Sequence, residues 1–342
     1  MTNARHNRSS LRRTLFVCAG LFFVLILAFL ISSILGAQRL SFGGALCALT
    51  GKANCSLSAE ERAILFDIRL PRILLAGAVG TCLAAAGAAY QALLRNPLAE
   101  PYLLGVSNGA AVGTMAALVF FGAYEWSRPV LAFAGATAAT FLVYRLARGR
   151  AGAAPERLIL AGVIVTTFLS SAIVFITTVM DATRIRSFTF WLLGDLSGTT
   201  SNLLIVAFLA AVVGVIALGV NARALNLLML GERDAFDLGV EVGRVRLVVF
   251  AAASLLVGAS VASSGSVGYV GLVVPHLVRL SFGSDNRLVI PAAAIGGATF
   301  VIIADTLART VIAPRELPVG AITALIGAPL FVYLLRRGAA SV

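Results

Sequence analysis

The stretch TLFVCAGLFFVLILAFLISSIL, residues 14–35, decides what kind of protein this is. It contains no charged residue, and it is long enough to cross the hydrocarbon core of a bilayer, which takes about 20 apolar residues. Because Arg12 and Arg13 precede it, the segment looks at first like a secretory signal. The apolar part of a signal peptide is only about 7–15 residues long. We therefore expect a transmembrane helix that is not cleaved.

The whole chain shares this apolar character. Of its 342 residues, 59% are hydrophobic and 12% are charged, whereas soluble domains carry about 25% charged residues. A chain of this composition has too little polar surface to face water, and a lipid bilayer is the solvent that suits it. The composition therefore excludes a soluble enzyme.

Ten apolar segments are long enough to be spans, which predicts an all-α, polytopic membrane protein with one transmembrane domain over residues 1–342. The eighth is the weakest, because glycines and Pro275 interrupt it. Segment 187–197 is too short to span and is expected to form a re-entrant or interfacial helix. The ten predicted spans are 14–36, 70–94, 103–122, 128–147, 157–180, 200–220, 245–264, 266–282, 288–309 and 317–336.

The positive charges predict the orientation. The formal net charge is +12, and the arginines lie mostly in short loops between apolar segments. Cytoplasmic loops are enriched in Lys and Arg, so we expect a cytoplasmic tail at 1–13 and, with an even number of spans, a cytoplasmic C-terminus. Arginine clusters within 62–72 and 184–186 break this rule on the outer side. No basic stripe interleaved with aromatic residues points to a nucleic-acid partner.

Cysteine and histidine give little evidence of a metal or cofactor site. No pair of cysteines has the CxxC spacing, and the chain has only two histidines, so neither a metal site nor a bound cofactor is expected. Cys47 and Cys55 share one loop on the predicted outer side. An oxidising compartment permits a disulfide there, and two free thiols are the alternative.

The longest polar stretch between spans is 221–244, on the predicted cytoplasmic side. Apolar residues alternate there with charges, and Gly231 and Gly239 are placed to end helices, so we predict two short helices broken at these glycines. An amphipathic cytoplasmic element of this kind either docks on a partner or lies on the lipid surface.

The sequence lacks an energy source of its own. The only Gly-Lys pair, Gly51-Lys52, lacks the spacing and the following Ser or Thr of a phosphate-binding loop. Asp305 is the best candidate for a coupling carboxylate, but Arg309 follows four residues later on the same helical face, so an ion pair is the simpler interpretation. We find no catalytic constellation and expect no enzymatic activity. A permease driven by a separate ATPase is favoured, and an ion-coupled secondary transporter is the alternative.

Six motifs in order closely resemble those of the FecCD family of permeases, the membrane subunits of bacterial ABC importers for ferric siderophores, haem and vitamin B12. Together they cover about residues 60–340, which makes the resemblance far more specific than any single motif. The motifs are RLPR (69–72), NPLAEPYLLGVSNGA (96–110), LGERDAFDLG (230–239), GYVGLVVPH (268–276), ADTLAR (304–309) and ELPVGAITALIGAP (316–329).

The resemblance implies the rest of the assembly. It implies ten helices, a homodimer in the inner (cytoplasmic) membrane with its lipid, and a translocation path at the dimer interface. It also implies two cytoplasmic ATP-binding subunits and a periplasmic or lipoprotein substrate-binding protein. The substrate would be a metal chelate, either a ferric siderophore, haem or cobalamin, and the chain alone does not select among them. One position, Asp195, departs from the glycine of vitamin B12 permeases.

The resemblance also assigns residues. Partly exposed Arg69, Arg72 and Arg309 would receive carboxylates of the binding protein, with lipid-headgroup contact as the alternative, and Gly105, Ser107, Asn108 and Gly109 would pack beside the path. The resemblance gives no firm role to Arg184 and Arg186. They either attract an anionic chelate or contact lipid. The loop that fits a groove in the ATPase would contribute Leu225, Leu228, Leu230, Gly231, Glu232, Ala235, Leu238 and Gly239.

Overall fold

The computed structural model of the chain is a bundle of helices, and the all-α prediction is confirmed. The described strands form a single antiparallel pair of two residues each, Arg148–Gly149 (β1) with Gly152–Ala153 (β2), between two helices. The structure describes residues 2–36, 38, 40–50, 55–121, 124, 126–149 and 152–339.

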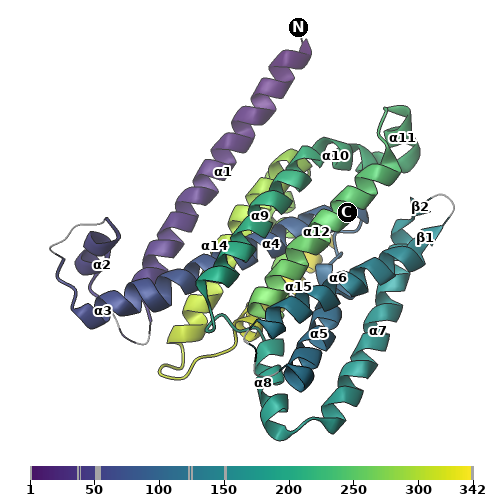
Figure 1. The fold of residues 1–342 in the computed structure, drawn as a ribbon. Helices are drawn as coiled ribbons and strands as arrows, with labels where there is room; N and C mark the ends of the chain where they lie inside the picture. The colour runs from purple at the N-terminus through teal and green to yellow at the C-terminus, as the bar shows by residue number, and fades with distance from the viewer. Residues whose placement is uncertain are drawn as a thin grey trace.

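The helices follow one another with short connections, as Figure 1 shows. Two helical turns of other types, a π-helical one at Ile64–Arg69 (η1) and a 3₁₀ one at Pro101–Leu104 (η2), lie among them. The α-helices are Thr2–Ile34 (α1), Phe42–Leu49 (α2), Ala59–Ala63 (α3), Leu70–Leu93 (α4), Val106–Phe120 (α5), Ser127–Ala147 (α6), Pro155–Val179 (α7), Ala182–Leu192 (α8), Ser201–Val220 (α9), Ala222–Leu230 (α10), Glu232–Asp237 (α11), Val242–Ser264 (α12), Val270–Phe282 (α13), Asn286–Thr310 (α14) and Val319–Ala339 (α15).

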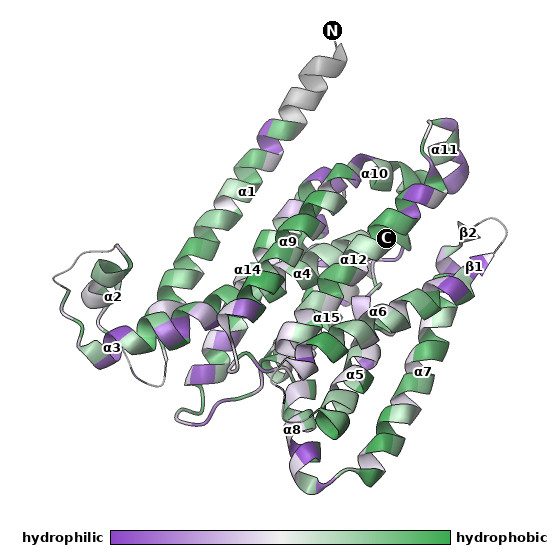
Figure 2. Cartoon of the chain, in the orientation of Figure 1, coloured by the Kyte–Doolittle hydropathy of each residue, from purple (hydrophilic) through white to green (hydrophobic). Residues whose placement is uncertain are grey.

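Each predicted span corresponds to a helix, and seven of the described helices are long and apolar enough to cross a bilayer. Two predicted spans are shorter helices, α5 and α13, and a third, α15, counts as apolar over Val319–Leu334. The start of α5 is later than predicted because Gly105 has a φ of 78° and ends η2. The start of α13 is later because residues 265–269 are not helical, and Tyr269 has a φ of 67°. In Figure 2, α7 and α9 are coloured mostly as hydrophobic, whereas α11 is mostly hydrophilic.

Helix α4 is the centre of the bundle and packs against α14, α12, α9 and α13. Its contact with α14 depends on two glycines, because a Cβ on Gly80 would meet the carbonyl of Gly297, and the reverse also holds. A Cβ on Gly87 would likewise meet the carbonyl of Gly271 on α13. Small residues let membrane helices approach this closely, so these glycines permit the tight packing of α4 against α14 and α13.

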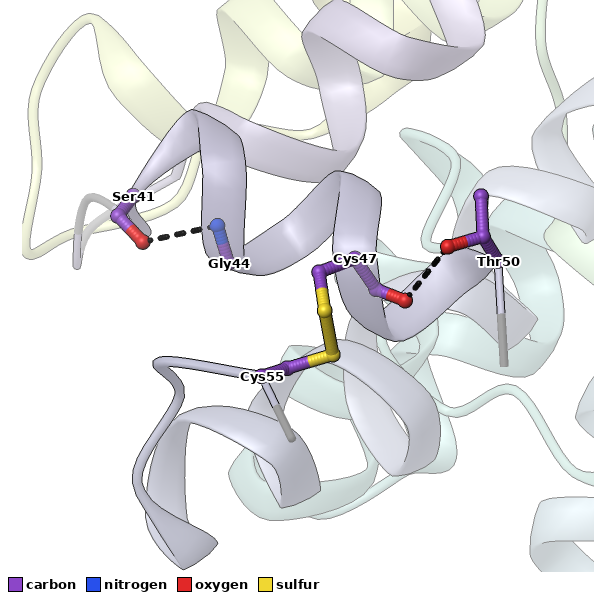
Figure 3. The surroundings of a disulfide bond; sticks show 5 residues. All are labelled: Ser41, Gly44, Cys47, Thr50 and Cys55. Atoms are coloured by element: carbon purple, nitrogen blue, oxygen red, sulfur yellow. Dashed lines mark hydrogen bonds between the residues drawn. A yellow bond between two sulfur atoms is a disulfide. The ribbon is translucent and has the colours of Figure 1, made fainter. Parts of the chain in front are cut away.

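Helix α1 and the segment after it lie at the edge of the bundle. Helix α1 packs along α14, and Arg13, in its N-terminal half, donates to the carbonyl of Phe282 at the end of α13 at 3.0 Å. A disulfide joins Cys47 of α2 to Cys55, which settles the alternative that the sequence left open (Figure 3). Leu40, Ala45 and Leu65 form a small separate core beneath it.

Candidate docking and pathway sites

Arg72, near the start of α4, is the centre of a buried ionic cluster at one end of the bundle. Its Nε donates to Asp305 Oδ1 at 2.9 Å, and its Nη1 donates to Glu316 Oε2 at 2.7 Å. The other oxygen of Asp305 accepts from Arg309 Nε, also at 2.9 Å. The sequence-predicted ion pair between Asp305 and Arg309 is therefore confirmed, and Arg72 completes it.

The same cluster joins α1 to the bundle. Arg309 Nη2 donates to Ser32 Oγ at 2.9 Å, and Thr306 donates to the same hydroxyl at 2.8 Å. Arg69 Nη1 donates to the carbonyls of Ser33 and Ile34 at 3.1 and 3.0 Å, at the end of α1. A guanidinium offers five donors in a fixed fork, which suits it to satisfy several acceptors at once.

The expectation that the three arginines are partly exposed is wrong. Arg69, Arg72 and Arg309 have exposed fractions of only 4%, 7% and 5%. Their burial is sustained by two carboxylates and by helix-end carbonyls, since a buried charge needs close partners. Among the charged residues of the cluster, Glu316 is the one whose side chain is substantially exposed, at 47%.

The two short helices predicted within 221–244 are confirmed as α10 and α11. Gly231 breaks them with a φ of 151°, and Gly239 follows α11 with a φ of 84°. Leu230, Phe236 and Leu238 expose 69%, 71% and 63% of their surface. These three exposed hydrophobic residues, called the apolar knob below, lie at the end of α10, within α11 and directly after α11.

Other residues of the predicted ATPase contact face inward. Leu225, Leu228 and Ala235 are buried and therefore hold α10 and α11 onto the bundle. Glu232 Oε1 accepts from the buried Arg246 of α12 at 2.5 Å. Arg95, in the loop after α4, lies 4.0 Å from the same oxygen. These two arginines are not among the predicted site residues, although Arg246 is a charge within a predicted span and such charges are usually paired.

The glycine-rich motif 96–110 places η2 and the start of α5 against other helices. Ser107 Oγ donates to Ser266 Oγ at 3.2 Å, and Asn108 Nδ2 donates to the carbonyl of Thr166 on α7 at 3.0 Å. A Cβ on Gly109 would lie 2.5 Å from Cβ of Ala139 on α6. These contacts agree with close packing at this position.

A second contact of this motif was not anticipated. Tyr102 Oη donates to the carbonyl of Val267 and accepts from its amide, both at 2.9 Å. Glu100 accepts from the amide of Tyr269 at 3.1 Å, at the N-terminus of α13. The carboxylate thus satisfies a helix-end donor, although burial raises its pKa. Glu100 could have been suspected as a charge within an otherwise apolar motif.

The short helix predicted around 187–197 is present as α8, which begins earlier, at Ala182. Arg184 pairs with Asp181 at 3.1 Å, and Arg186 lies over the ring of Phe190. The end of α8 is bonded to the start of α15, because the amides of Val319 and Gly320 donate to the carbonyls of residues 194 and 193 at 3.2 and 3.0 Å.

Two cavities bear on function. A small one of about 140 Å³ lies where α8 ends and α15 begins, and Arg72, Asp195 and Glu316 are among its lining residues. A larger one of about 880 Å³ lies between α1, α4, α9 and α14 and is lined by apolar side chains together with Gly77 and Thr81. The described lining of the larger cavity has no charged group to bind a polar solute, so it suits hydrocarbon.

The comparisons with known proteins agree with this architecture. The FecCD transport family model matches residues 24–337. The hemin transport system permease protein HmuU of Yersinia pestis is 40% identical over 93% of this chain and 94% of its own length. The cobalamin import system permease protein BtuC of Halobacterium salinarum is 44% identical over 80% of this chain and 73% of its own.

A solved structure gives the same result. A metal-chelate type ABC transporter in an inward-facing conformation is 32% identical, with a TM-score of 0.81 over 94% of this chain and 99% of that one. The match by sequence, by fold and over nearly the whole length shows that this chain belongs to the FecCD transport family, whose members are permease subunits of ABC importers.

Proposed function

We propose that this chain is the membrane half of a homodimeric, ATP-driven importer that moves a metal chelate from the periplasm to the cytoplasm. The observation that carries the proposal is the apolar knob of Leu230, Phe236 and Leu238, which is exposed among the charged residues of α11 in a chain of this family. Exposed apolar patches rimmed by polar residues are typical of protein interfaces. The partner here would be an ATP-binding subunit.

The attachment of the knob suits a mechanical role. Helix α11 is joined to α12 by the pair between Glu232 and Arg246, and Leu225 and Leu228 pack α10 into the core. A push from the ATPase on the knob would therefore move α12 with it. Rigid-body movement of packed helices is a common way to convert such a push into a change of access.

The proposed topology has ten spans, with α10 and α11 in the cytoplasm and both termini on that side. Figure 1 supports this, because the start of α1 and α11 lie toward one end of the bundle and α8 toward the other. The disulfide between Cys47 and Cys55 fits an oxidising outer compartment. The ionic cluster of Arg72 would then face the periplasm.

On that outer side we propose docking of a substrate-binding protein at the cluster of Arg69, Arg72 and Arg309. Burial does not remove this role, because a guanidinium held in place by neighbours loses little entropy when a carboxylate joins it. The chelate itself would be haem, cobalamin or a ferric siderophore. The relatives named for hemin and for cobalamin match this chain about equally well, so the binding protein would select.

Reconstitution tests the proposal directly. The chain in proteoliposomes with its ATP-binding subunit and binding protein should take up chelate only when ATP is present on the cytoplasmic side. Dissipating the proton and sodium gradients with ionophores should leave the rate unchanged. Uptake without ATP, or uptake abolished by the ionophores, would reject the proposal in favour of an ion-coupled transporter.

A further inference from the structure

Glu316 stands apart from the other charged residues of the outer cluster. It lies in the segment 311–318, between α14 and α15, and its Oε2 is 2.7 Å from Nη1 of Arg72. Its side chain is 47% exposed, whereas that of Arg72 is 8% exposed and that of Asp305 is 1% exposed. The two carboxylates that bind Arg72 therefore differ: one is fixed in the core, and the other lies at the surface.

The charges of the cluster leave it short of carboxylates. Asp305 pairs with Arg72 and Arg309, and Glu316 pairs with Arg72 alone. The third arginine, Arg69, donates to backbone carbonyls and has no carboxylate among these ion pairs. Water reaches the half-exposed Glu316 but not the buried Asp305. Of the two carboxylates that hold Arg72, Glu316 is thus the one that a carboxylate arriving from solvent can replace.

Release of Glu316 from Arg72 would affect the contact between α8 and α15. Two residues after it, Pro318 leads into α15, whose first amides are bonded to the carbonyls at the end of α8. The small cavity of about 140 Å³ is lined by Arg72, Glu316 and residues 194–197. This cavity gives the carboxylate of Glu316 and the adjoining Leu317 and Pro318 room to move.

We propose that Glu316 is an exchangeable carboxylate. It pairs with Arg72 while no binding protein is docked, and on docking a carboxylate of the binding protein replaces it. The exchange releases the segment 311–318 and, through Val319 and Gly320, loosens the contact between α15 and α8. Glu316 is therefore a positioning residue that couples docking to the end of α8 and the start of α15.

This inference rests on the proposed function, because it needs a partner that brings a carboxylate. The ligand class follows from the donor set. Arg72 is already aligned by Asp305, so its free edge accepts a planar carboxylate in the geometry that Glu316 now uses. We commit to an acidic side chain of a protein, and anionic lipid is the alternative that the experiment excludes.

The test compares wild type with Glu316→Gln in the complete complex, in nanodiscs of neutral lipid, with the cognate substrate-binding protein as the probe. Since docking then no longer has to displace a charged partner, we expect its Kd to fall by about tenfold. The binding protein should stimulate the ATPase less, because the release step has already occurred. Glu60→Gln on α3 is the matched control, since it removes the same charge from an exposed residue outside the cluster.

Three results would overturn the inference while leaving the proposed function intact. The first is an unchanged or weaker affinity of Glu316→Gln for the binding protein. The second is an equal gain of that affinity in Glu60→Gln. The third is an equal release of Glu316 from Arg72 in nanodiscs of anionic lipid without the binding protein. If wild type shows neither docking nor stimulation, the proposed function fails as well. Size-exclusion profiles and melting temperatures of both variants verify that they fold.

Hydrogen exchange gives a second readout that a purely structural role would not change. Docking should speed exchange of the amides of Leu317, Val319 and Gly320 in wild type, because their acceptors are then less well held. In Glu316→Gln the fast rate should be present before docking. Equal rates in the free and docked wild-type complex would overturn the inference.

Discussion

The strongest test of the outer cluster is Asp305→Asn. Asp305 is completely buried and accepts one hydrogen bond from each of two arginines, Arg72 and Arg309, both at 2.9 Å. Asparagine has nearly the same shape, so the substitution opens no cavity. It does replace one acceptor oxygen by an NH₂ group, which then faces the N–H of a guanidinium. It also removes the one buried negative charge between two buried positive charges.

The magnitude follows from that geometry. Removing one partner of a buried ion pair typically costs about 3–5 kcal/mol, because the remaining charge is left without compensation. Here two arginines lose their shared partner, while Glu316 continues to hold Arg72 from the surface. We therefore expect the free energy of unfolding to fall by about 3–5 kcal/mol.

Equilibrium unfolding in mixed dodecylmaltoside and SDS micelles measures this loss, with the fluorescence of Trp126 and Trp191 as the signal. Asp67→Asn is the control, because Asp67 is an exposed carboxylate near the same end of α4 and surface substitutions usually change stability by less than about 0.5 kcal/mol. A loss below about 1 kcal/mol for Asp305→Asn, with an unchanged slope, would refute the claim that this carboxylate compensates two buried charges.

Two further predictions concern packing and coupling. Gly80→Leu should lower the free energy of unfolding by about 1–3 kcal/mol in the same assay, because its Cβ would collide with the carbonyl of Gly297. The control Gly219→Leu, which has open space around it, should leave the free energy of unfolding unchanged. Phe236→Asp should leave unfolding unchanged but weaken ATPase association about 30-fold, as expected for an aromatic residue worth about 2 kcal/mol at an interface. Leu228→Asp should instead lower stability, because Leu228 is buried; a stable Leu228→Asp protein would contradict the assignment of inward and outward faces.

The sequence predicts the helices well and their internal breaks poorly. Long apolar segments such as 14–36 and 200–220 are readily recognised as helices, because within a bilayer a single segment can form all its backbone hydrogen bonds only as a helix. The delayed starts of α5 and α13 were missed, since they depend on the backbone at Gly105 and Tyr269, which adopt positive φ values in a tertiary context. The short helices α2 and α3 were also missed, as they are too brief for a periodic pattern to be recognised.

For the sites, the sequence predicts which residues matter better than it predicts which way they face. The spacing of Asp305 and Arg309 fixes their ion pair, because both lie on one face of a helix. It does not show that Arg72, more than two hundred residues away along the chain, completes the cluster. In the coupling motif, too, the sequence does not show which residues face outward. Leu228 is buried and Leu230 is exposed, although both are leucines on one short helix. Burial is set by neighbours distant in the sequence.

The contacts at the end of α8 suggest how signals from the two sides of the membrane would meet. The knob is joined to α12 through Glu232 and Arg246, and the carbonyl of Ser264, the last residue of α12, accepts from the amide of Asp195 at 2.8 Å. The residues just before Asp195 accept hydrogen bonds from the start of α15, which Glu316 controls from the outer side. A push on the knob and a carboxylate on Arg72 would thus act on one small group of backbone hydrogen bonds. Because packed α4 and α14 cannot slide past each other at Gly80, movement is expected at this junction, where α8 ends and α15 begins, and not in the centre of the bundle.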